Sequence, residues 1–219
     1  MELRAITIAR VIAFIPTEEL DPLGKVNTRE FMPALVEKYG FLKYPTNYED
    51  FDESKGITLE GGRWNDTNID KVVIYRNGLQ VDTRSSTKDS EQILEESLTW
   101  AATNYGLTFN PDMIRRKVYL SELLFSSEVS LDFLNPKLKD LTAQLAESVS
   151  RQLGVSLPYE TFGITFHFDP FVTKYTPANV RIERLMESPF SENKYYSIAP
   201  IHTDEHLKFL EDFEAVLKG

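Results

Sequence analysis

The chain has 219 residues, a formal net charge of −10 and no cysteine. The missing cysteines exclude disulfides, thiolate metal sites and a cysteine nucleophile. The acidic excess is spread over both halves and disfavours nucleic acid as a partner, because phosphate binding needs Lys and Arg. A chain of this length buries enough surface to fold without a metal or a disulfide.

The apolar runs are short. None approaches the roughly 20 residues of a transmembrane helix, and Arg10 interrupts the apolar N-terminal run, which argues against a signal peptide. We therefore expect a soluble, cytoplasmic protein without a membrane partner.

The first half reads as one strand, one helix, several strands and a second helix. Lys71–Arg76 and Leu79–Arg84 predict a hairpin, because Asn77-Gly78 is a strong two-residue turn signal. The other predicted elements are a strand at 3–15, helices at 28–39 and 87–105, and strands at 41–44 and 56–64.

The second half repeats this order. Strands are predicted at 113–125, 159–169, 178–187 and 194–200, and a last helix follows Thr203. In the first of these strands, Val118, Leu120 and Leu124 share a face.

The best-marked element is a helix that starts at Asn135-Pro136 and ends at Gly154, residues suited to its two caps. Its leucines and valine recur every three or four residues, which predicts one apolar stripe. The strand that follows carries phenylalanine and isoleucine on one face, so we expect the helix to pack on it. The stripe contains Leu138, Leu141, Leu145, Val149 and Leu153, and the strand face contains Phe162, Ile164, Phe166 and Phe168.

These elements predict an α+β fold, with a mixed or antiparallel sheet and helices packed on one face. The repeated order further suggests two similar β-α-β-β-β-α halves, residues 1–108 and 109–219, or one continuous domain.

Histidine provides the one candidate metal site. His167, His202 and His206 lie in the last quarter of the chain beside Asp169 and Asp204, and such a set suits zinc, iron or manganese. Against it, Thr203 resembles a helix cap and no HExxH signature is present. Phosphate-binding loops and a G-x-S-x-G motif are also absent from the sequence.

Two groups of residues suggest an interaction surface. Tyr44, Tyr48 and Phe51 flank an acidic loop, and aromatic residues are enriched at interfaces. Arg115 and Lys117 belong to the densest basic cluster and could receive an acidic partner or an anion.

The sequence thus favours a non-enzymatic protein-interaction component without a cofactor, either a homo-oligomer or a subunit of a larger complex. One alternative is a divalent-metal-dependent hydrolase that uses the histidines and Asp169. Another is a protein that binds a small anionic ligand between sheet and helices, with Arg115 and Lys117 as its anchors.

Overall fold

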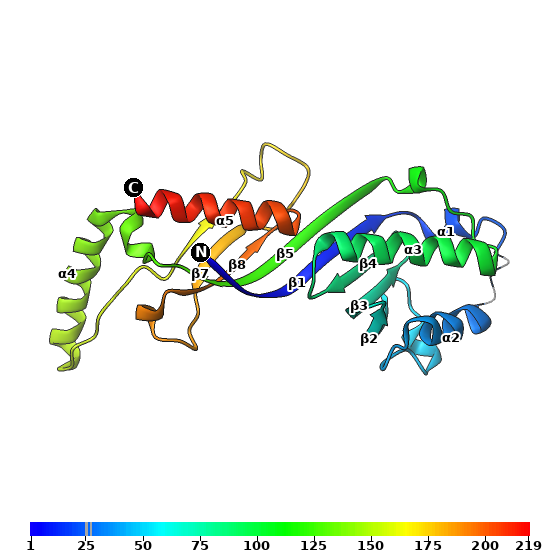
Figure 1. Ribbon diagram of the computed structural model, residues 1–219, viewed down its shortest axis with the longest axis horizontal. Coiled ribbons are helices and arrows are strands. Elements are labelled where there is room, and N and C mark those ends of the chain that lie inside the picture. Colours follow the sequence, from blue (N-terminus) through cyan, green and yellow to red (C-terminus); the bar gives the residue numbers. More distant parts are fainter. Residues whose placement is uncertain (25, 27) are drawn as a thin grey trace. The chain divides into compact units, whose positions relative to one another are not determined.

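The computed structural model describes residues 1–24, 26 and 28–219, and the side chains of Thr28, Arg29 and Tyr48 lie outside this description. The described residues form one eight-stranded antiparallel sheet and five α-helices (Figure 1). The predicted α+β fold is therefore confirmed.

The order along the chain is β-α-β-β-β-α, repeated once, with an extra short helix near the start. The strands follow one another across the sheet as β2-β3-β4-β1-β5-β8-β7-β6. In each half of the chain, the first strand is innermost and the fourth, third and second strands follow it towards the edge. The elements are β1 Glu2–Phe14, α1 Thr17–Leu20, α2 Thr28–Tyr39, β2 Ile57–Trp64, β3 Thr67–Tyr75, β4 Gly78–Thr83, α3 Thr87–Tyr105, β5 Arg116–Ser126, α4 Pro136–Leu153, β6 Gly163–Phe166, β7 Val180–Arg184, β8 Lys194–Ala199 and α5 Thr203–Lys218.

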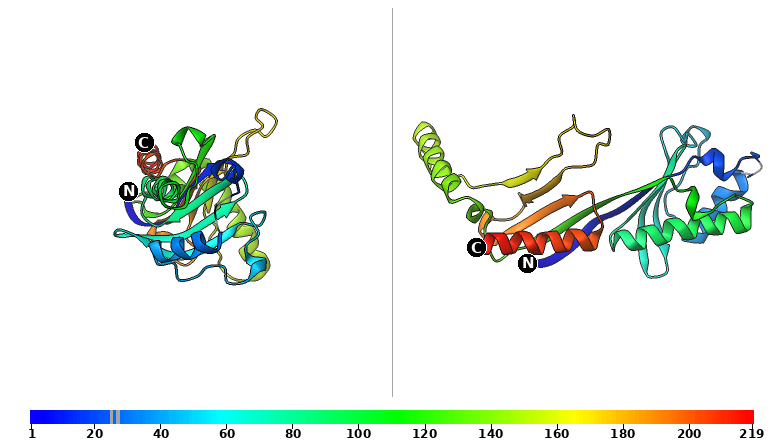
Figure 2. Two further views of the ribbon diagram at one scale, coloured as in Figure 1. Left: turned by 90° about the vertical axis from the view of Figure 1, so that its right-hand side faces the viewer. Right: turned by 90° about the horizontal axis from the view of Figure 1, so that it is seen from above.

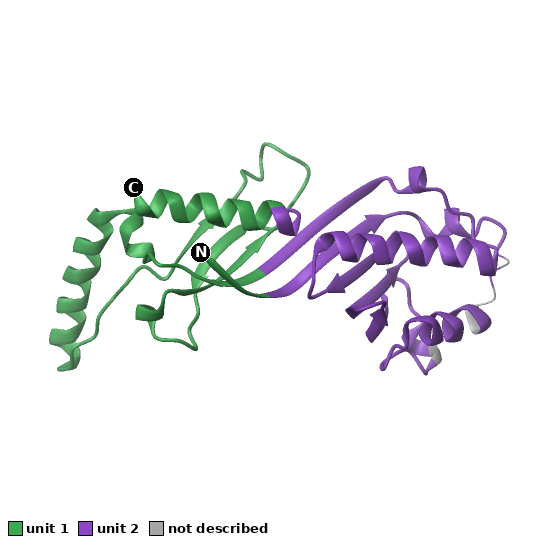
Figure 3. Cartoon of the chain, in the orientation of Figure 1, with its two compact units in different colours: residues 1–5, 123–199, 205–219 green, residues 6–122, 200–204 purple. Residues whose placement is uncertain are grey.

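The chain divides into two compact units, coloured in Figure 3. Unit 1 contains residues 1–5, 123–199 and 205–219, and unit 2 contains residues 6–122 and 200–204. The long strands β1 and β5 each contribute to both units, so this division differs from the predicted halves 1–108 and 109–219, which stay a prediction.

Unit 2 has its core between one face of its strands and the helices α2 and α3. α3 begins at Ser86, whose side chain accepts a hydrogen bond from the backbone N–H of Asp89, and ends at Gly106 in the left-handed conformation. The α3 stripe of Ile93, Leu94, Leu98 and Ala101 is buried against the sheet.

The predicted hairpin is present, but its turn was placed one residue too late. Tyr75 pairs with Gly78, so Arg76 and Asn77 form the turn and Gly78 is already part of β4. A Cβ atom on Gly78 would lie 2.4 Å from the backbone oxygen of Ala13. Glycine is therefore needed for the approach of β1 and not for the turn.

Two other strand predictions need adjustment. Residues 41–44 form only an isolated bridge between Lys43 and Glu60. β5 starts at Arg116, because Pro111–Met113 form a 3-10 turn capped by Asn110. The face of β5 that carries Leu124 stays half-buried, whereas Leu123 is fully buried on the opposite face.

Unit 1 has a smaller core, formed by α5 on one face of β5, β8 and β7. The buried stripe of α5 follows helical spacing through His206, Leu210, Phe213 and Leu217. Opposite this stripe lie buried strand residues, which include Leu123, Phe125, Ile182, Tyr195 and Ala199.

The predicted packing of α4 on the phenylalanine strand is wrong. No side chain of α4 is buried, and among its contacts those with the 3-10 turn Leu131–Leu134 that precedes it are the most numerous. Figures 1 and 2 show α4 projecting away from α5 and from the strands of unit 1. The helix caps fix where α4 begins and ends, but they do not determine what covers its apolar face.

Candidate interaction surface

Most of the exposed large hydrophobic side chains of the described chain lie in unit 1. Twenty large hydrophobic side chains are exposed, and fourteen of them belong to the single stretch from Phe133 to Tyr175. Large exposed apolar surfaces are rare on monomeric proteins and often mark interaction sites, so this stretch is the candidate interaction surface. The fourteen are Phe133, Leu134, Leu138, Leu141, Leu145, Leu153, Val155, Leu157, Tyr159, Phe162, Phe166, Phe171, Val172 and Tyr175.

Much of this surface is presented by an arm, residues 135–160, which consists of α4 and the segment that returns from it to β6. Both helix caps form as predicted. The side chain of Asn135 accepts a hydrogen bond from the N–H of Lys137, and Gly154 adopts the left-handed conformation at φ 70°. The leucine stripe is open to solvent, with Leu141 60% and Leu145 48% exposed.

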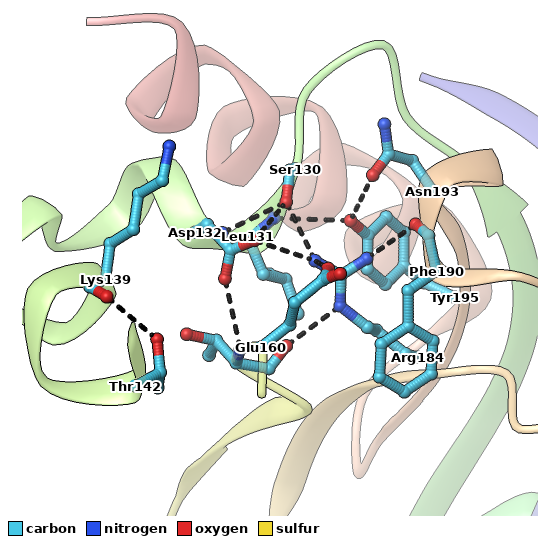
Figure 4. Close-up of polar contacts among 11 residues, drawn as sticks. Ser130, Leu131, Asp132, Lys139, Thr142, Glu160, Arg184, Phe190, Asn193 and Tyr195 are labelled. Carbon is cyan, nitrogen blue, oxygen red and sulfur yellow. Dashed lines mark hydrogen bonds and ion pairs between the residues drawn. The ribbon is translucent and has the colours of Figure 1, made fainter. Parts of the chain in front are cut away.

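The base of the arm is held by Arg184 at the end of β7. Its side chain is 1% exposed. Nε donates to the backbone oxygen of Thr161 and Nη1 to that of Phe190, each at 2.8 Å. Nη2 lies 3.3 Å from Asp132 Oδ2 and 3.2 Å from Glu160 Oε2 (Figure 4).

These contacts join the chain before the arm to the chain after it. Asp132 precedes α4, whereas Glu160 ends the return segment and Thr161 follows it, and Asp132 Oδ1 also accepts the N–H of Thr161 at 3.0 Å. A guanidinium group with its donors occupied in a fixed fork is suited to such a junction. Arg184 therefore closes the arm into a loop with a rigid base.

Aromatic rings complete the base. The guanidinium carbon of Arg184 lies 4.9 Å from the ring centre of Phe190 and 5.8 Å from that of Tyr195. The hydroxyl of Tyr195 donates to Asn193 Oδ1 and accepts the N–H of Leu131, and burial raises the pKa of this hydroxyl.

Beside the base, the edge strand β6 exposes apolar side chains on the face that α5 covers elsewhere. Phe166 is 48% exposed and its ring meets that of Phe209 on α5 edge-on, with centroids 6.2 Å apart. Phe162 and Ile164 alternate with it on the same face, and both are incompletely buried. Unit 1 thus presents two apolar surfaces, the α4 stripe and the β6 edge.

The three histidines have separate environments. The His206 Nε2 atom lies 2.8 Å from Ser197 Oγ inside the core of unit 1, and His167 is exposed in the loop after β6, as is Asp169. His202 belongs to unit 2, where its ring stacks on Tyr119 with centroids 3.7 Å apart. Among the described side chains, no three His, Asp or Glu residues are placed to hold a metal ion.

The predicted basic anchors are engaged within unit 2. Arg115 forms an ion pair with Glu19, and Lys117 with Glu91 and Glu95. Burial alone would lower the pKa of Lys117, but these two carboxylates raise it. Burial and Glu91 also raise the pKa of Tyr119 to about 12.

The predicted aromatic surface residues Tyr44 and Phe51 differ in their exposure. Tyr44 is half-exposed at the rim of a pocket that also contains Met32 and Phe51, and Phe51 packs against the core of unit 2. The side chain of Tyr48 lies outside the described part of the structure.

The sequence predicted both the apolar stripe of α4 and the phenylalanine face of the following strand. The prediction that these two surfaces pack on each other was wrong. It missed Arg184, because a single arginine near the end of a strand carries no pattern that predicts burial. It also missed the length of the exposed stretch, which could have been recognised from the apolar residues that continue between Gly154 and Phe162.

We compared the chain with known proteins, and no protein-family model and no curated protein matches it. None of the helices in the described part of the chain has the length and hydrophobicity to cross a bilayer.

Proposed function

We propose that this protein acts by self-assembly, and that two copies associate through the apolar surface of unit 1. The observation that carries the proposal is that α4, a well-capped amphipathic helix, has no buried side chain. An amphipathic helix gains most of its stability from packing its apolar face. Its own unit supplies no such cover, so another chain is the natural source.

The extent of the surface suits a stable dimer. An aromatic side chain buries roughly 150–250 Å², so the six Phe and Tyr residues among the fourteen, each 42–97% exposed, offer several hundred Å², and the eight Leu and Val residues add to this area. A standard interface uses about 800 Å² from each partner. A second copy is the simplest partner, because one chain carries both an apolar helix face and an apolar strand edge.

Size-exclusion chromatography with light scattering tests this proposal. We expect twice the monomer mass for the protein and the monomer mass for Leu145→Glu, since a charge in the centre of a dry interface is costly. Gln144→Glu is the matched control, because it adds the same charge at a neighbouring exposed position outside the stripe, and it should remain a dimer. A monomeric protein at high concentration would refute the proposal.

A second candidate function rests on a cavity in unit 2. A pocket of about 160 Å³ lies between α2, α3 and the sheet. An apolar cavity of about this volume can take up a benzene-sized molecule. Arg115 and Lys117 are not among its described lining residues, whereas the carboxylates of Asp21 and Glu53 are. We therefore propose an uncharged apolar ligand here instead of an anion.

Thermal melting with toluene and with benzoate tests the cavity. Toluene should raise the melting temperature of the protein and of Ala102→Leu, but not of Ala101→Leu, because Ala101 lines the cavity and Ala102 does not. Benzoate should have no effect. Equal shifts for both variants would place the ligand elsewhere.

A further inference from the structure

Resting on the proposed self-assembly, we infer that the two copies exchange arms, so that α4 of each copy packs beside α5 over β6 of the other. In such a dimer, each of the two apolar surfaces of unit 1 is covered by the other copy.

Unit 2 shows how this fold covers an edge strand. There α2 lies beside α3 and contacts β2. Tyr39 at the end of α2 donates its hydroxyl proton to Glu96 on α3, and burial together with that carboxylate raises its pKa. The ring of Phe31 of α2 packs against that of Trp100 and meets that of Tyr105 edge-on, both on α3. As a result, the edge strand residues Ile57 and Leu59 are buried.

In unit 1 the corresponding position is not covered. β6 is the edge strand, as β2 is in unit 2, and α5 corresponds to α3 in the repeated order. The helix that would correspond to α2 is α4, but it projects away (Figures 1 and 2). Phe166 of β6 and Phe162, which directly precedes β6, consequently remain about half-exposed.

The apolar stripe of α4 has the same residue spacing as the buried stripe of α2, the helix that covers the edge strand in unit 2. In α2 the buried residues are Met32, Leu35 and Tyr39, at spacings of three and four. Leu138, Leu141 and Leu145 of α4 have the same spacings. A helix with this stripe can lie over an apolar strand as α2 does.

The base of the arm favours a second copy over closure within one chain. Arg184 and Asp132 fix both ends of the arm together, with α4 directed away from β6. Folding α4 back onto its own β6 would have to turn the helix around on a base that these buried polar contacts hold in place. Exchange between two copies keeps them and buries both apolar surfaces in an isologous interface.

Charge agrees with this arrangement. α4 carries three basic and two acidic residues, whereas α5 carries two basic and five acidic residues. In a protein that is acidic overall, α4 is therefore the helix best suited to lie beside α5.

Cross-linking tests the exchange cleanly, because the chain has no cysteine of its own. A chain with Leu141→Cys is mixed with a chain with Phe166→Cys, the mixture is oxidised, and disulfide-linked dimers are measured. We expect a cross-link between the two different chains, since the exchange brings α4 of one copy over β6 of the other. Glu147→Cys, on the polar side of α4, replaces Leu141→Cys in the control and should not cross-link to Phe166→Cys.

The outcomes separate the two proposals. Dimers by light scattering without the Leu141–Phe166 cross-link would overturn the exchange and leave self-assembly standing. A monomer would overturn both. A chain with both substitutions that cross-links at the monomer mass would show closure within one copy and would also overturn the exchange. In the unmodified protein, hydrogen exchange at α4 and β6 should slow together on dimerisation, and an unchanged β6 would contradict the inference.

Discussion

Glu214 is an acidic residue placed on the buried stripe of α5, with 8% of its side chain exposed. Oε2 contacts the amino group of Met1 at 2.5 Å, and Oε1 accepts from Ser127 Oγ at 2.7 Å. The backbone N–H of Glu128 and Lys218 Nζ complete its partners. Unit 1 thus holds a carboxylate inside its core by surrounding it with donors.

These donors predict a pH dependence. Burial alone would raise the pKa of Glu214, but the donors lower it from 4.5 to about 2. The stability that this carboxylate provides is therefore present above pH 4.5 and is lost as the pH falls towards 2. Its full value would be on the order of 2–3 kcal/mol.

We expect Glu214→Gln to lower the unfolding free energy at pH 7 by about 2 kcal/mol and to match the parent protein near pH 2. Urea unfolding across this pH range measures both. Glu211→Gln, at an exposed position of the same helix, is the control. A difference that persists unchanged to pH 2 would contradict the assigned pKa.

Arg184 is the second residue whose surroundings predict a large effect. Replacing it with Met would leave Asp132 and Glu160 without their cation and remove the junction at the base of the arm. We expect a loss of about 3–5 kcal/mol in thermal or urea unfolding. Arg181→Met, which removes an exposed partner of Glu183, should change stability by less than about 1 kcal/mol. Equal effects of both substitutions would argue against the junction.

At the scale of the elements, local signals were reliable where one residue determines the backbone. Asn135 and Gly154 placed both ends of α4, because capping depends on neighbouring atoms only. What α4 packs against depends on contacts distant in sequence, so the stripe alone could not settle it. The same limit hid Arg184, whose burial results from residues on three separate segments.

The hairpins illustrate the limit of turn signals. Asn77-Gly78 predicted a hairpin correctly but misplaced its turn, since Gly78 serves the contact with β1. The hairpin between β2 and β3 was missed at Asn65-Asp66, where Asn65 has a φ of 50° and Trp64 pairs with Thr67. Asparagine tolerates this conformation better than most residues, so a signal was present.

This placement of Gly78 is testable. Gly78→Ala should lower the unfolding free energy by about 2 kcal/mol, because its Cβ would overlap the backbone of β1. Asn77→Ala should cost less than about 0.5 kcal/mol, since Asn77 has no positive φ and its backbone oxygen still accepts the N–H of Ile15. Urea unfolding of both variants decides. The opposite ranking would restore the turn centred on Asn77-Gly78.

At the scale of the whole molecule, the repeated element order has a counterpart inside unit 2. Thr87 opens α3 and Thr203 opens α5, 116 residues later. The N–H of each donates to the hydroxyl of the other at 3.0 Å. The two threonines thus occupy corresponding positions in the repeated order and make the same contact with each other. Helices α2 and α4 hold the same place in the repeated element order, but α2 packs on its sheet and α4 is exposed. The difference between them therefore marks the position that a partner could cover.

If a second copy covers the exposed apolar surface of unit 1, the stability of the protein must depend on its concentration. Mass action then favours the folded dimer, so the melting temperature should rise by about 2 °C or more for each tenfold increase in concentration. Leu145→Glu should abolish the dependence and Gln144→Glu should retain it, because only the first charge lies in the α4 stripe. Scanning calorimetry over about a hundredfold range of concentration measures this. A constant melting temperature would mean that the exposed α4 stripe is tolerated by a monomer, and the function would have to be sought in the cavity of unit 2.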